Sequence, residues 1–293
     1  MYSMLLDIIA VVALICAAYL GVGLFMYCMQ PRFLYEPIRK ISCTPVKFGL
    51  DFEEVYFKTA DRLLLHGWFI PAPNAKFTVL YCHGNGGNMM YFLNTVNFLN
   101  KLGLNCFIFD YRGYGESQGA PSENGTYLDA RAAYRWLTKK KSVAPQQIIL
   151  FGWSLGGSIA AYLATKSKSA GLVIENAFTS YSAIGQKFFP YMPVKLFARF
   201  DYPTIDYVRK VTCPILVIHS KNEEIIPFEL GLEIYDAANE PKRFVEIIGR
   251  HQRRHRHIPG KPKTGDAYEK AWTNWLTFLK ELADIENAQQ KYA

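Results

Sequence analysis

The sequence lacks the cysteine spacing of a disulfide framework or a zinc site. Its six cysteines are scattered, and none of them forms a C-x-x-C pair. Disulfide-rich and zinc-binding domains instead repeat cysteines at short spacings. Cys82, Cys106 and Cys213 lie in or beside short apolar runs, where a free cysteine behaves as a small hydrophobic residue. We therefore expect a reduced protein without disulfides, metal ions or cofactors.

Charge is missing from one long stretch near the N-terminus. No charged residue occurs from Ile8 to Gln30, a run of 23 residues. As a helix, this run would be about 35 Å long, enough to cross the hydrocarbon core of a bilayer. A cleavable signal peptide has a basic segment before a shorter apolar core, whereas no basic side chain precedes this run. The sequence predicts an uncleaved single-span anchor over residues 1–30, with residues 8–30 in the membrane.

The first basic residues follow the apolar run instead of preceding it. They are Arg32, Arg39, Lys40 and Lys47. Basic residues that flank a membrane span concentrate on its cytoplasmic side. We therefore expect the remainder of the chain to lie in the cytoplasm.

After a connector over residues 31–50, short β-like runs alternate with segments of helical period. The later runs are almost continuously apolar, as in parallel strands covered on both faces, and the first two form an antiparallel hairpin pattern. The pattern predicts one α/β domain over 51–293, with a mostly parallel eight-stranded sheet between two layers of helices. The runs are 55–59, 63–70, 78–84, 105–111, 148–154, 171–177, 214–220 and 243–249, and the helical segments are 89–102, 126–140, 155–166, 228–238 and 267–288.

Residues 181–212 interrupt this alternation. The segment is rich in aromatic residues and contains Pro190, Pro193 and Pro203. Its length suits a small helical cap rather than a domain. Two interpretations stay open: its apolar side chains could simply pack against the rest of the domain, or they could form a substrate-facing lid near the membrane.

The segment "FGWSLGG" follows an apolar run and precedes a helix of small residues. Gly152, Ser154 and Gly156 match G-x-S-x-G, the pattern of a sharp strand-to-helix turn that projects a nucleophilic serine above a sheet. Glycines are needed there because side chains would clash in so tight a turn. Ser154 is therefore the candidate nucleophile.

The segment "YCHGNGGN" ends an earlier run and could bind a developing oxyanion. The backbone N–H of Asn85 would be one donor, and that of Leu155, directly after the candidate nucleophile, would be the other. In a third motif, "IFDYRGYGESQG", we interpret Asp110 and Arg112 as residues that brace a glycine turn.

A serine nucleophile needs a base and a carboxylate that orients it. Glu223 and Glu224 follow the run 214–220, and His251 follows the last run. The order serine, acid, histidine is that of the hydrolase constellation built on G-x-S-x-G. We interpret His66, His83 and His219, which lie in strand or turn segments, as structural.

Taken together, these segments resemble the α/β-hydrolase family, and in particular its Bem46-like group of membrane-anchored serine hydrolases. The resemblance covers nearly the whole chain, through "QPRFLYEP", "HGNGGN", "FDYRGYGES", "GWSLGG", "HSKNEEIIPF" and "AYEKAWTNWLTFL". It implies the α/β-hydrolase fold and hydrolysis of esters or thioesters. In this group the acid comes four residues after the histidine of the preceding strand, which implies Glu223 rather than Glu224, although aspartate is usual there. A second departure from the group is Arg250, which replaces a small residue beside His251.

A basic cluster surrounds His251. No acidic residue occurs from Ile247 to Gly265. Aromatic residues are missing from the cluster, which argues against nucleic-acid binding, and its guanidinium groups would repel a metal ion at His255 and His257. Two interpretations remain, a solvated loop and a surface for anionic lipid headgroups. The arginines of this cluster are Arg250, Arg253, Arg254 and Arg256.

Two functions stay open at this point. The first is a membrane-anchored serine hydrolase that acts on lipid-like or acyl esters. The second is a catalytically weak hydrolase-fold protein that serves as a membrane scaffold or binder, which the altered residues around His251 favour.

Overall fold

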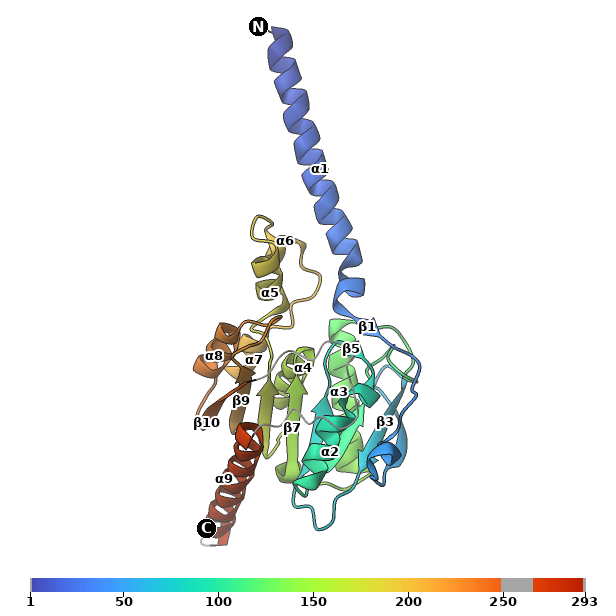
Figure 1. The fold of residues 1–293 in the computed structure, drawn as a ribbon, viewed down its shortest axis with the longest axis vertical. Helices are drawn as coiled ribbons and strands as arrows, with labels where there is room; N and C mark the ends of the chain where they lie inside the picture. Colours follow the sequence, from blue (N-terminus) through green and yellow to red (C-terminus); the bar gives the residue numbers. More distant parts are fainter. Residues whose placement is uncertain (1, 249–265, 292–293) are drawn as a thin grey trace.

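The alternating pattern folds into a central eight-stranded sheet (Figure 1). The computed structural model describes residues 2–248 and 266–291, with side chains up to residue 285. The strands of the sheet are β2 (Glu53–Lys58), β3 (Leu64–Ile70), β4 (Thr78–Cys82), β6 (Asn105–Phe109), β7 (Ile148–Trp153), β8 (Gly171–Glu175), β9 (Ile215–Ser220) and β10 (Lys242–Ile247).

The strand order is β10-β9-β8-β7-β4-β6-β3-β2. Strand β3 pairs antiparallel with both β2 and β6, and the other five neighbouring pairs are parallel. The predicted mostly parallel sheet with an initial hairpin is confirmed. The carboxyl ends of β4, β7, β8 and β9 therefore lie along one edge, where the candidate site residues follow the strands.

The predicted helical segments are also present. They are α2 (Leu93–Lys101), α3 (Glu123–Lys139), α4 (Leu155–Ala164), α8 (Phe228–Ala237) and α9 (Asp266–Lys291). Helix α3 begins three residues before the periodic pattern because Ser122 caps it, accepting a hydrogen bond of 3.2 Å from the N–H of Gly125. Short 3-10 helices lie at Pro45–Phe48, Met89–Phe92 and Pro145–Gln147.

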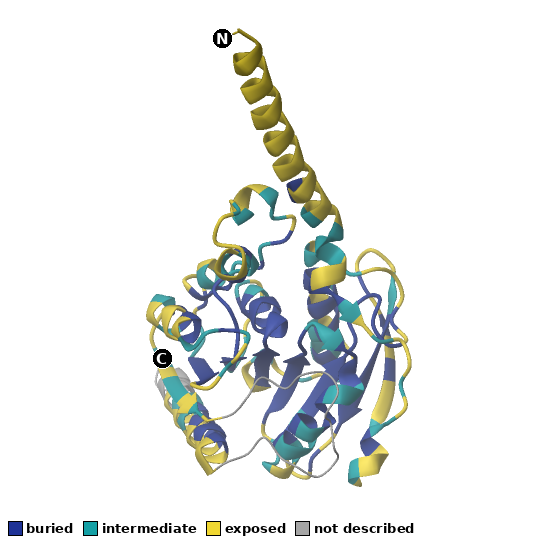
Figure 2. Ribbon diagram, turned by 45° about the horizontal axis from the view of Figure 1, so that its top comes forward, coloured by how far each residue is buried: buried dark blue, intermediate teal, exposed yellow. Residues whose placement is uncertain are grey.

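Two cores form because the strands between β2 and β10 bury both of their faces (Figure 2). Leu80 on β4 packs in the core beneath α3, α4 and α8, whereas its neighbours Val79 and Tyr81 face the core beneath α2 and α9. Successive side chains of a strand point to opposite faces. This explains why the inner parallel strands are almost continuously apolar in the sequence.

Helix α1 (Tyr2–Leu34) extends away from the sheet (Figures 1 and 2). Its most apolar stretch has a mean hydropathy of 2.7, and only 6% of that stretch is buried. A core helix of a soluble domain would be mostly buried, so this helix is not one. The helix runs four residues beyond the predicted end of the anchor and includes Pro31.

A second, two-stranded sheet was not predicted. Strand β1 (Glu36–Pro37) pairs in parallel with β5 (Gly86–Gly87). It joins the chain directly after α1 to the "HGNGGN" turn after β4.

The aromatic segment forms three short helices, α5 (Tyr181–Phe188), α6 (Val194–Phe197) and α7 (Thr204–Val208). Helices α5 and α6 stand above the carboxyl edge of the sheet, beside the lower part of α1 (Figure 1). We call residues 181–212 the cap.

Candidate active site

Ser154 occupies a sharp turn between β7 and α4. Its backbone has φ 56° and ψ −122°, a conformation that costs free energy for any residue with a Cβ. The turn is held by hydrogen bonds of 2.9 Å from the N–H of Ser154 to the carbonyl of Glu175 and from the N–H of Gly157 to the carbonyl of Ser154. The predicted nucleophile therefore has the strained backbone that this role requires.

The glycines around Ser154 are explained by close contacts between backbone segments. A Cβ on Gly152 would overlap the backbone of Gly156, and one on Gly156 would overlap the carbonyl oxygen of Cys82. The strand-to-helix turn thus packs directly against the end of β4. This contact places Ser154 beside the "HGNGGN" turn.

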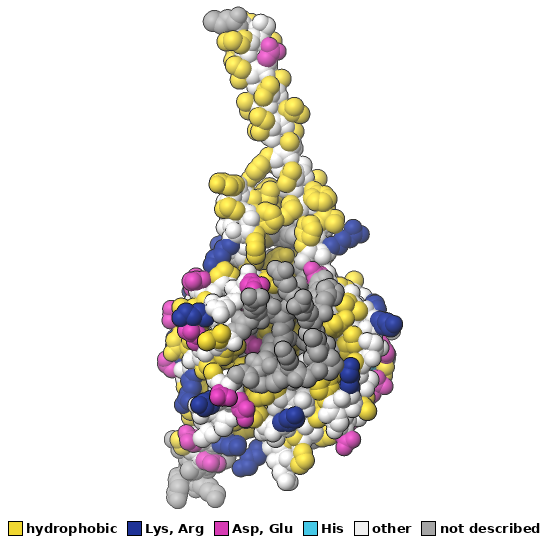
Figure 3. Space-filling model, in the orientation of Figure 1, with side chains coloured by type: hydrophobic (Ala, Val, Ile, Leu, Met, Phe, Trp, Pro, Cys, Tyr) yellow, Lys and Arg dark blue, Asp and Glu magenta, His cyan; other side chains and the backbone are white. Residues whose placement is uncertain are grey.

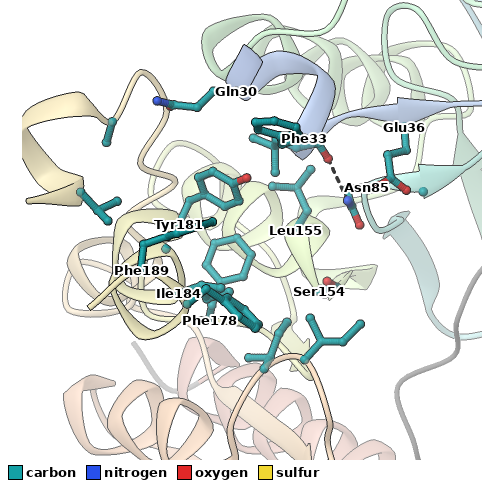
Figure 4. Close-up of a pocket in the computed structure, with 18 of the residues that line it drawn as sticks. Gln30, Phe33, Glu36, Asn85, Ser154, Leu155, Phe178, Tyr181, Ile184 and Phe189 are labelled. Carbon is teal, nitrogen blue, oxygen red and sulfur yellow. Dashed lines mark hydrogen bonds between the residues drawn. The ribbon is translucent and has the colours of Figure 1, made fainter. Parts of the chain in front are cut away.

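Asn85 and Leu155 lie on the same cavity as Ser154 (Figure 4). The carbonyl of Asn85 accepts hydrogen bonds from the N–H of Glu36, at 3.1 Å, and from the Tyr114 hydroxyl, at 2.7 Å. Its side-chain amide donates to the carbonyl of Leu34 at 2.8 Å. The turn that carries Asn85 is therefore held on three sides, by β1, by the glycine loop after β6 and by the end of α1.

Asp110 stabilises the "HGNGGN" turn through the residues at its two ends. It is fully buried; its Oδ1 accepts a hydrogen bond of 2.7 Å from the N–H of Met89 and lies 3.3 Å from Nε2 of His83. Asp110 thus acts on the turn rather than on Ser154. His83 is itself buried and stacks on Phe92, in keeping with a structural role.

Arg112 holds the glycine loop against the rest of the domain. Its guanidinium lies 2.8 Å from carboxylate oxygens of both Asp129 on α3 and Asp61. The hydrogen bond from Arg112 lowers the pKa of Asp61 to about 2. These residues are bracing groups outside the cavity.

Glu223 lies in the loop after β9 and is half-buried, whereas Glu224 is exposed. The Oε1 atom of Glu223 accepts a hydrogen bond of 2.9 Å from the N–H of Ile225. Ile225 and Ile226 line the cavity that Ser154 faces. The loop that carries both candidate acids therefore borders the site.

The candidate base lies outside the described residues. Strand β10 ends at Ile247, parallel to β9 and four residues before His251. The basic cluster lies outside the described residues as well, with Arg250, Arg253, Arg254, Arg256, His255 and His257.

The other nucleophilic or metal-binding side chains near the site have structural surroundings. Cys82 ends β4 next to the turn, but it is fully buried, and burial raises the pKa of its thiol to about 12. His66 contacts the carboxylate of Glu54, and His219 contacts the backbone carbonyl of Ile226. Within the described residues, no three His, Cys, Asp or Glu side chains are grouped to hold a metal ion.

An apolar cavity of about 710 Å³ opens beside Ser154, within the range of small-molecule sites of about 300–1,000 Å³. Its walls come from the end of α1, the "HGNGGN" turn and the residues after it, the turn at Ser154, the cap with the segment before it, and the loop after β9. The sequence did not reveal the contribution of α1. The lining residues of α1 are Met26, Gln30, Phe33 and Leu34, and those of the cap include Tyr181, Ile184, Phe188, Phe189, Met192, Val194 and Phe197, with Phe178 just before the cap.

Comparison with known proteins agrees with this geometry. Residues 78–214 match a family model described as alpha/beta hydrolase fold. Rv2307c of Mycobacterium tuberculosis is 36% identical over 250 residues, which cover 83% of this chain and 86% of that protein. Protein bem46 of Schizosaccharomyces pombe is 31% identical over 217 residues, 69% of this chain and 73% of that protein.

Solved structures show the same fold at low identity. The esterase Pf2001 of Pyrococcus furiosus superposes with a TM-score of 0.64 at 20% identity, over 85% of this chain and 97% of that one. The sheet, the turn at Ser154 and the sequence relatives lead to one conclusion: the chain belongs to the α/β-hydrolase fold family and, within it, to the Bem46-like group.

Proposed function

We propose that this protein is a membrane-anchored serine hydrolase that cleaves carboxylic esters or thioesters with an apolar acyl group. The observation that carries the proposal is the strained Ser154, which lines an apolar cavity together with the two candidate oxyanion donors, Asn85 and Leu155. Aliphatic and aromatic side chains dominate the cavity walls, which suits an acyl chain better than a sugar or a peptide.

The proposed reaction follows from the roles of these groups. The Ser154 hydroxyl attacks the carbonyl carbon while His251 accepts its proton, and the N–H groups of Asn85 and Leu155 stabilise the oxyanion. His251 then returns the proton to the departing alcohol or thiol, leaving an acyl-enzyme. Water, activated by the same histidine, releases the acid. Glu223 orients His251 and offsets the charge of the imidazolium.

We further propose that α1 remains attached as a membrane anchor. Its length and hydropathy alone would also suit a signal sequence. However, four of its residues line the cavity, and Leu34 accepts the hydrogen bond from Asn85. Removal of α1 would take away one wall of the cavity and one support of the oxyanion turn. We place the catalytic domain in the cytoplasm, as the basic residues after the span indicate.

Labelling with a fluorophosphonate probe tests the catalytic proposal. We expect wild-type protein to be labelled and Ser154→Ala to lose both labelling and ester hydrolysis, with kcat falling by at least about 10³-fold. Ser158→Ala is the matched control. Ser158 lies on α4, the helix that follows Ser154; it is fully buried, and its hydroxyl has no hydrogen-bond partner in the described part of the chain. Equal labelling of Ser154→Ala and wild type would refute the assignment.

A further inference from the structure

We propose that the tip of the cap, residues 188–197, lies in the bilayer beside α1, and that an acyl chain of a membrane lipid passes between them into the cavity. The substrate class would then be a lipid that is resident in the bilayer. This inference rests on the proposed membrane anchor for its first half and on the proposed hydrolase function for its second.

The tip of the cap is attached to α1 within the charge-free run. The Tyr19 hydroxyl donates a hydrogen bond of 3.2 Å to the carbonyl of Tyr191. The ring of Phe197 lies so close to Gly23 that a Cβ there would come within 2.7 Å of it. At the end of the run, the side chain of Gln30 donates to the carbonyl of Phe197 and accepts a hydrogen bond of 2.6 Å from the N–H of Arg199.

These contacts set the depth of the tip in the membrane. The charge-free run of 23 residues is about 35 Å long, and a bilayer core is about 30 Å thick, so nearly the whole run is needed to span it. Gln30 therefore lies near one boundary. Gly23 and Tyr19 lie seven and eleven residues before it, about 10 and 16 Å into the hydrocarbon. The parts of the cap that contact them must lie at similar depths.

The composition of the tip fits this environment. It carries one charged residue, the exposed Lys195, whose long aliphatic stem allows the ammonium group to reach toward the headgroups. Large apolar side chains cluster on its surface, which is unusual for a surface in water. Figure 3 shows them continuing the hydrophobic surface of α1, with Lys and Arg side chains flanking the base. Those most exposed are Tyr191 (95%), Leu196 (82%), Phe188 (60%) and Phe189 (48%).

The cavity connects this membrane-level surface to the nucleophile. Met26 and Gln30 of α1 line it together with Phe189 and Phe197 of the tip, and so does Ser154. Figure 4 shows Gln30 and Phe189 on the side of the cavity away from Ser154. Phe189 both lines the cavity and is half exposed, so the cavity reaches the surface at the tip. An acyl chain that enters here leaves the bilayer for another apolar environment and avoids the free-energy cost of exposing each methylene group to water.

The placement of the tip can be tested without any activity measurement. In vesicles of phosphatidylcholine brominated on its acyl chains, we expect the added tryptophan of Leu196→Trp to be quenched. The control is Val46→Trp, a position that is 65% exposed on the domain and distant from the cap in the sequence. If the two added tryptophans are quenched equally little, the tip does not lie in the bilayer and the proposal fails.

The route of the acyl chain is tested with Gly23→Leu, which forces Phe197 away from α1. Its control is Gly21→Leu, because a Cβ on Gly21 meets nothing within 4 Å. With a long-chain ester carried in vesicles, we expect Gly23→Leu to lose at least about tenfold in rate and Gly21→Leu to match wild type. Hydrolysis of p-nitrophenyl acetate and fluorophosphonate labelling should be the same in all three proteins, since these small reagents reach Ser154 from water.

The outcomes separate the two proposals. If wild type neither hydrolyses the small ester nor reacts with the probe, the hydrolase function is wrong, while the quenching result still decides where the tip lies. If the small ester is hydrolysed but Gly23→Leu cleaves the vesicle-borne ester as fast as Gly21→Leu, the passage between α1 and the cap is refuted and the hydrolase function stands.

Discussion

The side-chain amide of Asn85 donates a 2.8 Å hydrogen bond to the backbone carbonyl of Leu34, the last residue of α1 (Figure 4). Directly after it, β1 pairs with β5 in the same turn. The helix proposed to cross the membrane is thus attached to the turn proposed to stabilise the oxyanion.

Asn85→Ala should lower kcat because the oxyanion turn loses its tie to α1. The backbone N–H remains, so we expect a loss smaller than the roughly 10²–10³-fold caused by removing an oxyanion donor. Steady-state kinetics with a small soluble ester measure it. Asn100→Ala is the control, since Asn100 makes an equivalent 2.8 Å bond to Pro71 away from the site. Identical kinetics in the two variants would show that the tie has no catalytic role.

Glu223→Gln should reduce kcat by several orders of magnitude, because an amide cannot orient His251 or offset the charge of the imidazolium. Glu224→Gln should have a much smaller effect, as Glu224 is exposed beside the half-buried Glu223. The measurement is kcat for both variants on one ester. The reverse ranking would assign Glu224 as the acid.

His251→Ala should abolish turnover, since Ser154 would lose its base. His255→Ala and His257→Ala should retain wild-type kcat. Burst kinetics with a chromogenic ester would detect any residual acylation. Loss of activity in either control, with His251→Ala still active, would place the base elsewhere in the segment.

The arginines of the basic cluster are expected to face anionic headgroups, each contributing about 1 kcal/mol near a charged surface. Replacing Arg253, Arg254 and Arg256 with Gln should weaken association with anionic vesicles, most strongly at low salt, because salt screens such charges. The kcat for a small soluble ester should not change. Vesicle association that is insensitive to both salt and these substitutions would identify a solvated loop.

The orientation of the domain can be tested with a reporter thiol. Val46→Cys, in a background where Cys16, Cys28, Cys43 and Cys213 are Ser, should resist an impermeant maleimide in intact cells and react after permeabilisation. Position 46 is exposed, whereas Cys82 and Cys106 are buried and should stay unreactive. Ready labelling in intact cells would place the domain on the opposite side of the membrane.

Much of the fold could be predicted because it depends on local pattern. Runs that are almost continuously apolar identified most of the parallel strands, since the strands inside the sheet bury both faces, whereas the edge strand β10 carries charged residues. The turn at Ser154 could also be predicted, because the backbone is so crowded there that only glycine fits two residues before and two residues after the serine, which leaves a recognisable sequence pattern.

The walls of the cavity could be decided only by the tertiary structure. Gln30 and Phe197 are 167 residues apart in the sequence, and β1 and β5 are two residues long. No periodicity marks such contacts, because each depends on where the folded sheet places two distant segments. The sequence by itself determined the strands, the helices, the apolar span and the nucleophile turn. Only the tertiary structure decided that the apolar span forms part of the cavity. The reason is that α1 and the cap contact each other only after the sheet has brought both of them to its carboxyl edge, above Ser154.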